Sequence, residues 1–132
     1  MNSKCEINSN GDKSWLLNGL RHREDGPTIE SFNGSKFWWL NRVRHREDGP
    51  AIEWYNGDKE WFLNGFLHRE NGPAIEYASG TKHWYYRGKR HREDGPAMEY
   101  ANGDKAWFYK GKYINCKDNE EFIRMIKLMV FL

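Results

Sequence analysis

The sequence predicts a mainly β protein: an elongated, single-layer antiparallel sheet of five 23-residue β-hairpin repeats, closed by a C-terminal α-helix. The first observation is that the chain aligns with itself at a fixed spacing, which indicates one supersecondary unit stacked as an array. The second is a Trp at the same offset in every copy, namely Trp15, Trp38, Trp61, Trp84 and Trp107. The third is the combination of 16% aromatic residues with a mean hydropathy of −1.00, which favours a thin sheet over a compact multilayer fold.

Alternation of side chains predicts a hairpin within each copy. In the third copy, the segment 51–55 alternates and ends at Asn56-Gly57, a strong hairpin signal because both turn positions accept a positive φ. A two-residue turn there pairs Ile52 with Trp61. A four-residue loop keeps each residue on the same face, whereas a three-residue loop with a bulge would upset this assignment.

The predicted register gives the sheet two faces of different character. One face repeats Ile or Met beside Trp, as the stacking core of a repeat protein should. The other face varies between copies and holds several large aromatic residues, which mark an interaction patch when they are exposed. Neutral drift of a solvated face is the alternative interpretation. The candidate protein-binding residues are Phe37, Trp39, Tyr55, Glu60, Phe62, His83 and Tyr85.

The last segment predicts a helix, so we divide the chain into a repeat array at 1–115 and a capping helix at 116–132. Asp118 and Glu121 have the spacing of a capping box, and Phe122, Ile126 and Met129 follow at helical spacing. A helix of about 14 residues is too short to be stable alone in water. We expect it to dock on the last hairpin and cover a sheet edge. Alternatively, its apolar end contacts a second subunit, so the chain is a monomer or a homodimer.

A second string, His-Arg-Glu-Asp-Gly-Pro, joins the copies and begins at His22, His45, His68 (with Asn71 in place of Asp) and His91. Copies spaced about 9–10 Å apart by two strands cannot share one metal ion, whose bonds are about 2 Å long. No constellation of reactive side chains is unique to one copy. We therefore expect a structural string, in which Asp-Gly turns the chain and Pro restarts the strand, and neither an enzyme nor a metal or cofactor site.

The distribution of charge along the chain indicates one alternative class of binding partner. The net charge of +2 provides no global field for nucleic acid or acidic membranes. Locally, a basic run beside two tyrosines is the one feature typical of nucleic-acid binding. Nucleic acid or a nucleotide is therefore the alternative to a protein partner. The candidate phosphate-binding residues are Arg87, Lys89, Arg90 and Arg92.

The termini and the cysteines predict a cytoplasmic protein with reduced thiols. Cys5 and Cys116 lie at opposite ends of the predicted array, farther apart than the Cα separation of about 7 Å that a disulfide tolerates. The amino terminus lacks the apolar run of a signal peptide, and no segment is long and apolar enough to span a membrane.

The repeat resembles the MORN repeat, particularly its variant form in bacterial and viral proteins, at segments 63–68 and 100–105. The resemblance covers residues 10–112. It lacks the usual Tyr-x-Gly-x-Trp start and has Arg-Glu-Asp inserted between His and Gly, a form similar to repeats of bacteriophages and large DNA viruses. MORN-like arrays are mostly protein-interaction modules without catalytic residues; some are proposed lipid binders, and one bacterial branch is labelled as antitoxins. The resemblance thus implies a protein-binding module: a viral inhibitor that occludes a host defence protein in the host cytoplasm, or an antitoxin-like partner of a toxin.

Overall fold

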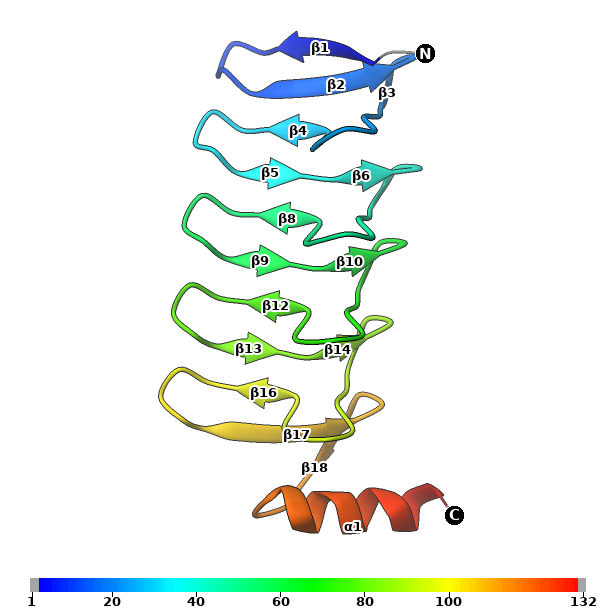
Figure 1. The fold of residues 1–132 in the computed structure, drawn as a ribbon, viewed down its shortest axis with the longest axis vertical. Coiled ribbons are helices and arrows are strands. Elements are labelled where there is room, and N and C mark those ends of the chain that lie inside the picture. The colour runs from blue at the N-terminus through cyan, green and yellow to red at the C-terminus, as the bar shows by residue number, and fades with distance from the viewer. Residues whose placement is uncertain (1–2, 131–132) are drawn as a thin grey trace. The chain divides into compact units, whose positions relative to one another are not determined.

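The computed structural model describes residues 3–130 and confirms the predicted fold class, a mainly β chain of antiparallel hairpins with one C-terminal helix in this range (Figure 1). The chain divides into two compact units, Met1–Phe66 and Leu67–Leu132, called unit 1 and unit 2 below. Each unit repeats the same pattern of two successive hairpins. Within unit 1, Figure 1 shows the loops of the first hairpins on the left and the turns of the second hairpins on the right.

Unit 1 contains a main sheet with the strand order β1-β2-β4-β5-β8-β9. These strands are β1 (Lys4–Ile7), β2 (Lys13–Leu17), β4 (Ile29–Glu30), β5 (Lys36–Phe37), β8 (Ile52–Glu53) and β9 (Lys59–Glu60). The second hairpins add β3 (Leu20–Arg21) beside β2, β6 (Trp39–Leu40) with β7 (Val43–Arg44), and β10 (Phe62–Leu63) with β11 (Phe66–Leu67), which straddles the unit boundary in sequence.

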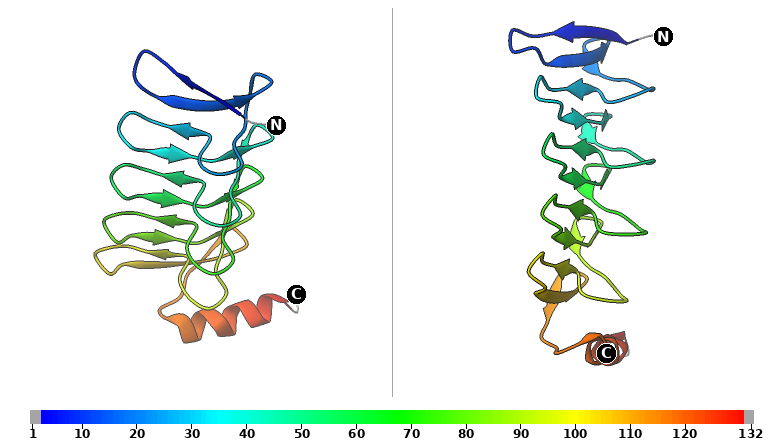
Figure 2. Two further views of the ribbon diagram at one scale, coloured as in Figure 1. Left: turned by 45° about the horizontal axis from the view of Figure 1, so that its top comes forward. Right: turned by 60° about the vertical axis from the view of Figure 1, so that its left-hand side comes forward.

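Unit 2 contains a main sheet with the strand order β12-β13-β16-β17-β18, and α1 follows it. The elements are β12 (Ile75–Glu76), β13 (Lys82–His83), β16 (Met98–Glu99), β17 (Lys105–Tyr109), β18 (Lys112–Ile114) and α1 (Asn119–Val130). The separate second hairpin consists of β14 (Tyr85–Tyr86) and β15 (Lys89–Arg90). Both views in Figure 2 place α1 beside the last hairpin of this unit.

The first hairpin of each repeat closes through a three-residue loop. In the third repeat the Trp54 amide donates to the Asp58 carbonyl (2.9 Å), and the Gly57 amide donates to the Trp54 carbonyl (3.0 Å). Gly57 has a φ of 98°, which suits the left-handed residue that follows a type I turn in such loops. The two-residue turn predicted from Asn56-Gly57 is therefore wrong.

This loop changes which residues share a face. Ile52 pairs with Glu60 and not with Trp61. A shift of one residue exchanges the faces of a strand, so the predicted division into a uniform face and a variable face is wrong. Ala51 is 0% exposed and Ile52 is 1% exposed, so both faces of this strand are covered. The other repeats have the same register, with the pairs Ile29–Phe37, Ile75–His83 and Met98–Ala106.

The second hairpin of each repeat turns through two residues, and sequence analysis did not separate it from the first. Its first turn residue has a positive φ in every repeat and is followed by a residue that also has a positive φ, as type I′ turns require. The second turn residue is Gly except at Arg42. The first turn residues are Asn18, Asn41, Asn64, Arg87 and Lys110.

The arginine of the His-Arg-Glu-Asp-Gly-Pro string holds its loop together. The Arg46 guanidinium lies 3.8 Å from the centre of the Trp38 ring, and it donates to Asp48 (2.9 Å) and to the Pro50 carbonyl (3.1 Å). The bond and the charge of Arg46 lower the pKa of Asp48 below its usual 3.8. Arg23 and Arg92 stack on Trp15 and Trp84 in the same way, at 3.8 and 3.9 Å.

The helix packs on the last hairpin of unit 2, as the sequence predicted. Phe122 is fully buried against Trp107 and Ile114, which are 8% and 5% exposed. The Asp118 carboxylate accepts the Glu121 amide (2.8 Å), so Asp118 caps the helix as its position in the capping box predicted.

Candidate functional site

Two histidines of unit 2 connect an acidic loop to a basic turn. His91 Nδ1 accepts a hydrogen bond from the Lys110 backbone amide (2.8 Å), and its Nε2 lies 3.4 Å from the Glu93 carboxylate. In the preceding repeat, His68 Nδ1 accepts the Arg87 amide (2.9 Å), and its Nε2 lies 3.6 Å from Glu70. Because Nδ1 accepts, each neutral ring carries its proton on Nε2 and can donate it to the glutamate.

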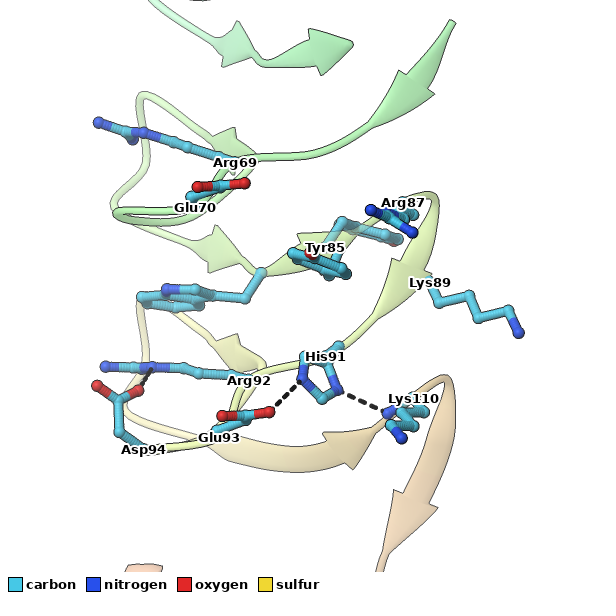
Figure 3. Close-up of a pocket in the computed structure, with 12 residues that line it drawn as sticks. Arg69, Glu70, Tyr85, Arg87, Lys89, His91, Arg92, Glu93, Asp94 and Lys110 are labelled. Atoms are coloured by element: carbon cyan, nitrogen blue, oxygen red, sulfur yellow. Dashed lines mark hydrogen bonds and ion pairs between the residues drawn. The ribbon is translucent and has the colours of Figure 1, made fainter. Parts of the chain in front are cut away.

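These connections flank a groove of about 650 Å³ within unit 2 (Figure 3). Tyr85 and Tyr86 line it, and the Tyr86 ring lies between the rings of His68 (4.5 Å) and His91 (6.1 Å). In Figure 3 the basic side chains Arg87, Lys89 and Lys110 lie on one side of Tyr85, and the carboxylates Glu70 and Glu93 lie on the other. The groove therefore has a basic wall and, across the aromatic rings, a wall in which the carboxylates of Glu70, Glu93 and Asp94 outnumber the guanidinium groups of Arg69 and Arg92. We call this second wall the acidic wall.

The basic run predicted to bind phosphate is divided between two environments. Arg92 is engaged by Asp94 at 3.0 Å and by Glu99 at 3.7 Å, in addition to Trp84. Arg90 lies 3.4 Å from the Tyr85 hydroxyl oxygen, to which it donates, and 5.3 Å from the Phe108 ring.

The other two members of that run, Arg87 and Lys89, line the groove and make no ion pair with any residue in the described range 3–130. Sequence analysis missed a third such cation, Lys110. Its signal was a lysine at the turn position that is Asn in three other repeats.

Four of the candidate protein-binding residues in unit 1 lie in two different places, and both places are partly enclosed. Phe37 makes an edge contact with Trp54 (5.3 Å), and the Trp54 indole donates to Glu60 (2.6 Å). Trp39 follows Trp38, the residue that separates β5 from β6. The Cζ atoms of Arg21 and Arg44 lie 5.4 and 5.8 Å from the centre of the Trp39 ring. Phe62 is only 8% exposed. These contacts distribute the four residues over the first and second hairpins.

Tyr55 lies apart from these residues, at the tip of a first-hairpin loop, and 68% of it is exposed. Of the five candidates in unit 1 it is the one with a large free surface. Its predicted role in binding stays a prediction.

His83 of unit 2 lies among aromatic rings. Its ring centre is 5.4 Å from that of Tyr77 and 5.8 Å from that of Tyr100. Its Nε2 is buried and has no hydrogen-bond partner among the residues that the structure describes. Burial, and secondarily the charge of Arg90, lowers the pKa of His83 below 6.5. A neutral ring in this setting packs against its neighbours.

A row of exposed apolar residues on unit 1 was missed by sequence analysis. Leu20, Val43 and Phe66 each follow a second-hairpin turn and are 49%, 37% and 59% exposed. The turns of the second and third repeats lie side by side, because the Gly65 amide donates to the Arg44 carbonyl (2.9 Å). We call these three residues the apolar tip row. Their common signal is their position relative to a turn that sequence analysis did not recognise.

Searches with models of known protein families and among curated proteins find no match to this chain. Within residues 3–130, no group of three or more His, Cys, Asp or Glu side chains is arranged to hold a metal ion. No helix in that range is long and apolar enough to cross a membrane. The surface features of the two units are therefore the observations from which a function can be argued.

Proposed function

We propose that the chain is a non-enzymatic, MORN-like protein-binding repeat and that unit 1 provides its main contact surface. The observation that carries this proposal is the apolar tip row of Leu20, Val43 and Phe66, whose exposure offers hydrophobic surface to a partner. Three successive repeats extend over about 20 Å at the usual strand spacing. That reach suits a standard interface, which buries about 800 Å² on each partner.

Trp39 extends this surface. It lines a second groove together with Leu20 and Arg21, entirely within unit 1. Tryptophan and arginine are the residues in which interfaces concentrate their energy, and two arginines flank the Trp39 ring. A partner that covers the tip row would therefore find an aromatic anchor beside it.

The proposed mode of action is occlusion. A row of tips presented by a repeat scaffold can cover a partner's functional surface without chemistry of its own. A viral inhibitor of a host defence protein and an antitoxin-like partner of a toxin are two versions of this mechanism. Both place the chain in the cytoplasm with its target.

Affinity purification from the native host, followed by mass spectrometry, tests the proposal. The wild-type chain should capture a specific protein, and Val43→Ser, Phe66→Ser and Trp39→Ala should each weaken that capture. A hot-spot loss of about 2 kcal/mol corresponds to roughly 30-fold in Kd.

Lys112→Ser is the matched control, because Lys112 occupies the tip position of the last repeat and is also exposed. It should retain the partner, and Val43→Ser, Phe66→Ser and Lys112→Ser should keep the wild-type melting temperature. Tyr55→Ala tests the opposite end of the hairpins. Equal capture by every variant, or no specific capture at all, would contradict the proposal.

A further inference from the structure

The turns beside the unit 2 groove contain residues that are unfavourable for their backbone conformation. Arg87 and Lys110 both have a φ of 50°, in the left-handed region. The same position is Asn in the other three repeats, and Asn tolerates this region better than a long side chain does. Strain at a position where a better residue is available points to a function for the residue present. In this case the strained residues place two cations on one wall of the groove.

Two histidines hold the backbone of the cation-bearing turns in position before any ligand arrives. His91 fixes the Lys110 turn through Nδ1 and approaches Glu93 through Nε2. His68 does the same for Arg87 and Glu70. Each histidine therefore sets the separation between one cation-bearing turn and one carboxylate, as Figure 3 shows for His91, Lys110 and Glu93. Groups held in this way lose less freedom when they bind.

The volume of the groove and the aromatic residues that line it limit the kind of ligand that it can bind. Its volume of about 650 Å³ lies in the range of small-molecule sites. Tyr86 is 41% exposed, and its ring is held between two imidazoles. Because the two imidazoles flank Tyr86, the stacking surface for a flat group is the ring of Tyr85, which is half-buried and also lines the groove. Bases stack on aromatic side chains in this manner.

We propose that the groove of unit 2 binds a nucleotide whose base carries an exocyclic amino group. Its phosphate lies against Arg87, Lys89 and Lys110, which have no competing ion pair in the described residues. The base lies over the Tyr85 ring, and its amino group donates to Glu70 or Glu93. Carboxylates accept hydrogen bonds from base amino groups. An acidic peptide fits less well, because its carboxylates would meet the acidic wall.

This site is separate from the protein-contact surface proposed for unit 1. Titration calorimetry at low salt with adenosine and inosine nucleotides tests it directly. AMP and ATP should bind, and each should bind about tenfold more tightly than IMP or ITP, which carry an oxygen in place of the amino group. Raising the salt concentration should weaken binding severalfold, because the basic wall is exposed to solvent.

Substitutions in the basic wall and in the acidic wall test the role of each wall in nucleotide binding. Arg87→Asn and Lys110→Asn restore the residue of the other repeats and should each weaken ATP binding about tenfold by removing a charge-assisted contact. Glu93→Gln and Glu70→Gln give the acidic wall a donor, so at least one of them should reduce or reverse the preference for adenosine over inosine. Lys105→Ala is the matched control, since Lys105 is an exposed cation of unit 2 that does not line the groove.

Several outcomes would overturn the proposal. One is no heat from any of the nucleotides at millimolar concentration in a folded protein. Another is equal affinity for the adenosine and inosine nucleotides in the wild-type chain. A third is ATP binding that Lys105→Ala weakens as much as Arg87→Asn does. Tighter binding of an oligoglutamate peptide or of inorganic phosphate than of AMP would also assign the groove to a different ligand.

Discussion

Units 1 and 2 use one repeat scaffold but present opposite surface chemistry. Unit 1 has 9 Lys and Arg against 10 Asp and Glu, a formal charge of −1, whereas unit 2 has 12 against 9, a charge of +3. At the tip position, unit 1 has Leu20, Val43 and Phe66, while unit 2 has Lys89 and Lys112. The comparison shows that a repeat can keep its loops and stacked arginines while the chemistry of its turn residues changes.

The units also differ in how their terminal strands are covered. The four residues of β1 in unit 1 are all exposed. In unit 2, α1 buries Trp107 and Ile114 of the last hairpin. Burial of large side chains is the main source of stability in a small domain, so equivalent residues should differ in their contribution.

The largest expected effect is that of truncating Trp107. Trp107→Ala should lower the free energy of unfolding by about 3–5 kcal/mol, as large aromatic truncations in cores do. It also removes the bond from the indole to Asn119 (2.7 Å). Trp15→Ala, at the same position of unit 1, should cost about 1–2 kcal/mol, because Trp15 is half-buried and is covered by Arg23. Urea denaturation measures both changes in the free energy of unfolding. Equal losses would show that packing of α1 on Trp107 adds little stability.

A smaller effect is expected from His83. His83→Phe gives unit 2 the residue that Phe37 provides at the same position of unit 1. Removing a buried nitrogen without a partner should raise stability by about 1–2 kcal/mol.

The pH dependence gives this prediction its sign. Burial lowers the pKa of His83 in the folded state below its ordinary 6.5. Above pH 6.5 His83 is neutral in both the folded and the unfolded chain and causes no pH-dependent loss of stability. As the pH falls from 6.5 through the folded-state pKa, the unfolded chain takes up the proton first, so the free energy of unfolding decreases. The stability gain of His83→Phe should grow over that window. A gain that stays constant with pH, or a loss of stability, would contradict the prediction.

Reciprocal turn substitutions should have the next largest effect. Arg87→Asn should stabilise unit 2, and Asn64→Arg should destabilise unit 1, each by about 1 kcal/mol, because Asn is better suited to the left-handed region. The midpoint of urea unfolding measures both changes. If Arg87→Asn leaves stability unchanged, the cation causes no strain, and the argument that function retains it fails.

The repeats and the helix could be predicted from the sequence because their signals are local. Trp recurs at a fixed spacing, and Asp118 precedes an amphipathic segment. The faces could not be predicted, because Asn56-Gly57 fits both a two-residue turn and a three-residue loop, and the choice moves Ile52 from Trp61 to Glu60. A local signal fixes where the chain turns, but not how many residues the turn uses.

The candidate sites were predicted less well for a related reason. Arg87 and Lys89 were recognised as part of a basic run, but Lys110 lies one repeat away in sequence and reaches the same groove through stacking. Arg92 carries the same charge yet is occupied by Trp84 and Asp94. Composition cannot distinguish an available cation from an engaged one, because engagement depends on contacts between loops.

The smallest effect concerns the thiols and should leave stability unchanged. Cys5 of unit 1 is exposed, whereas Cys116 of unit 2 is half-buried, and both are free. Burial raises the pKa of Cys116, and the charges of Glu121 and Asp118 add to this. Less thiolate at neutral pH means slower reaction, since the thiolate is the nucleophile.

A colorimetric disulfide reagent should therefore modify Cys5 first and Cys116 in a slower phase, and denaturant should bring the two rates together. Glu121→Gln keeps a residue suited to the capping box, so it should accelerate the slow phase without unfolding α1. Reductant should not alter the melting curve, because neither thiol is in a disulfide. Two equal rates in the native protein would mean that α1 does not shield Cys116, which would remove the contrast between the exposed strand of unit 1 and the covered end of unit 2.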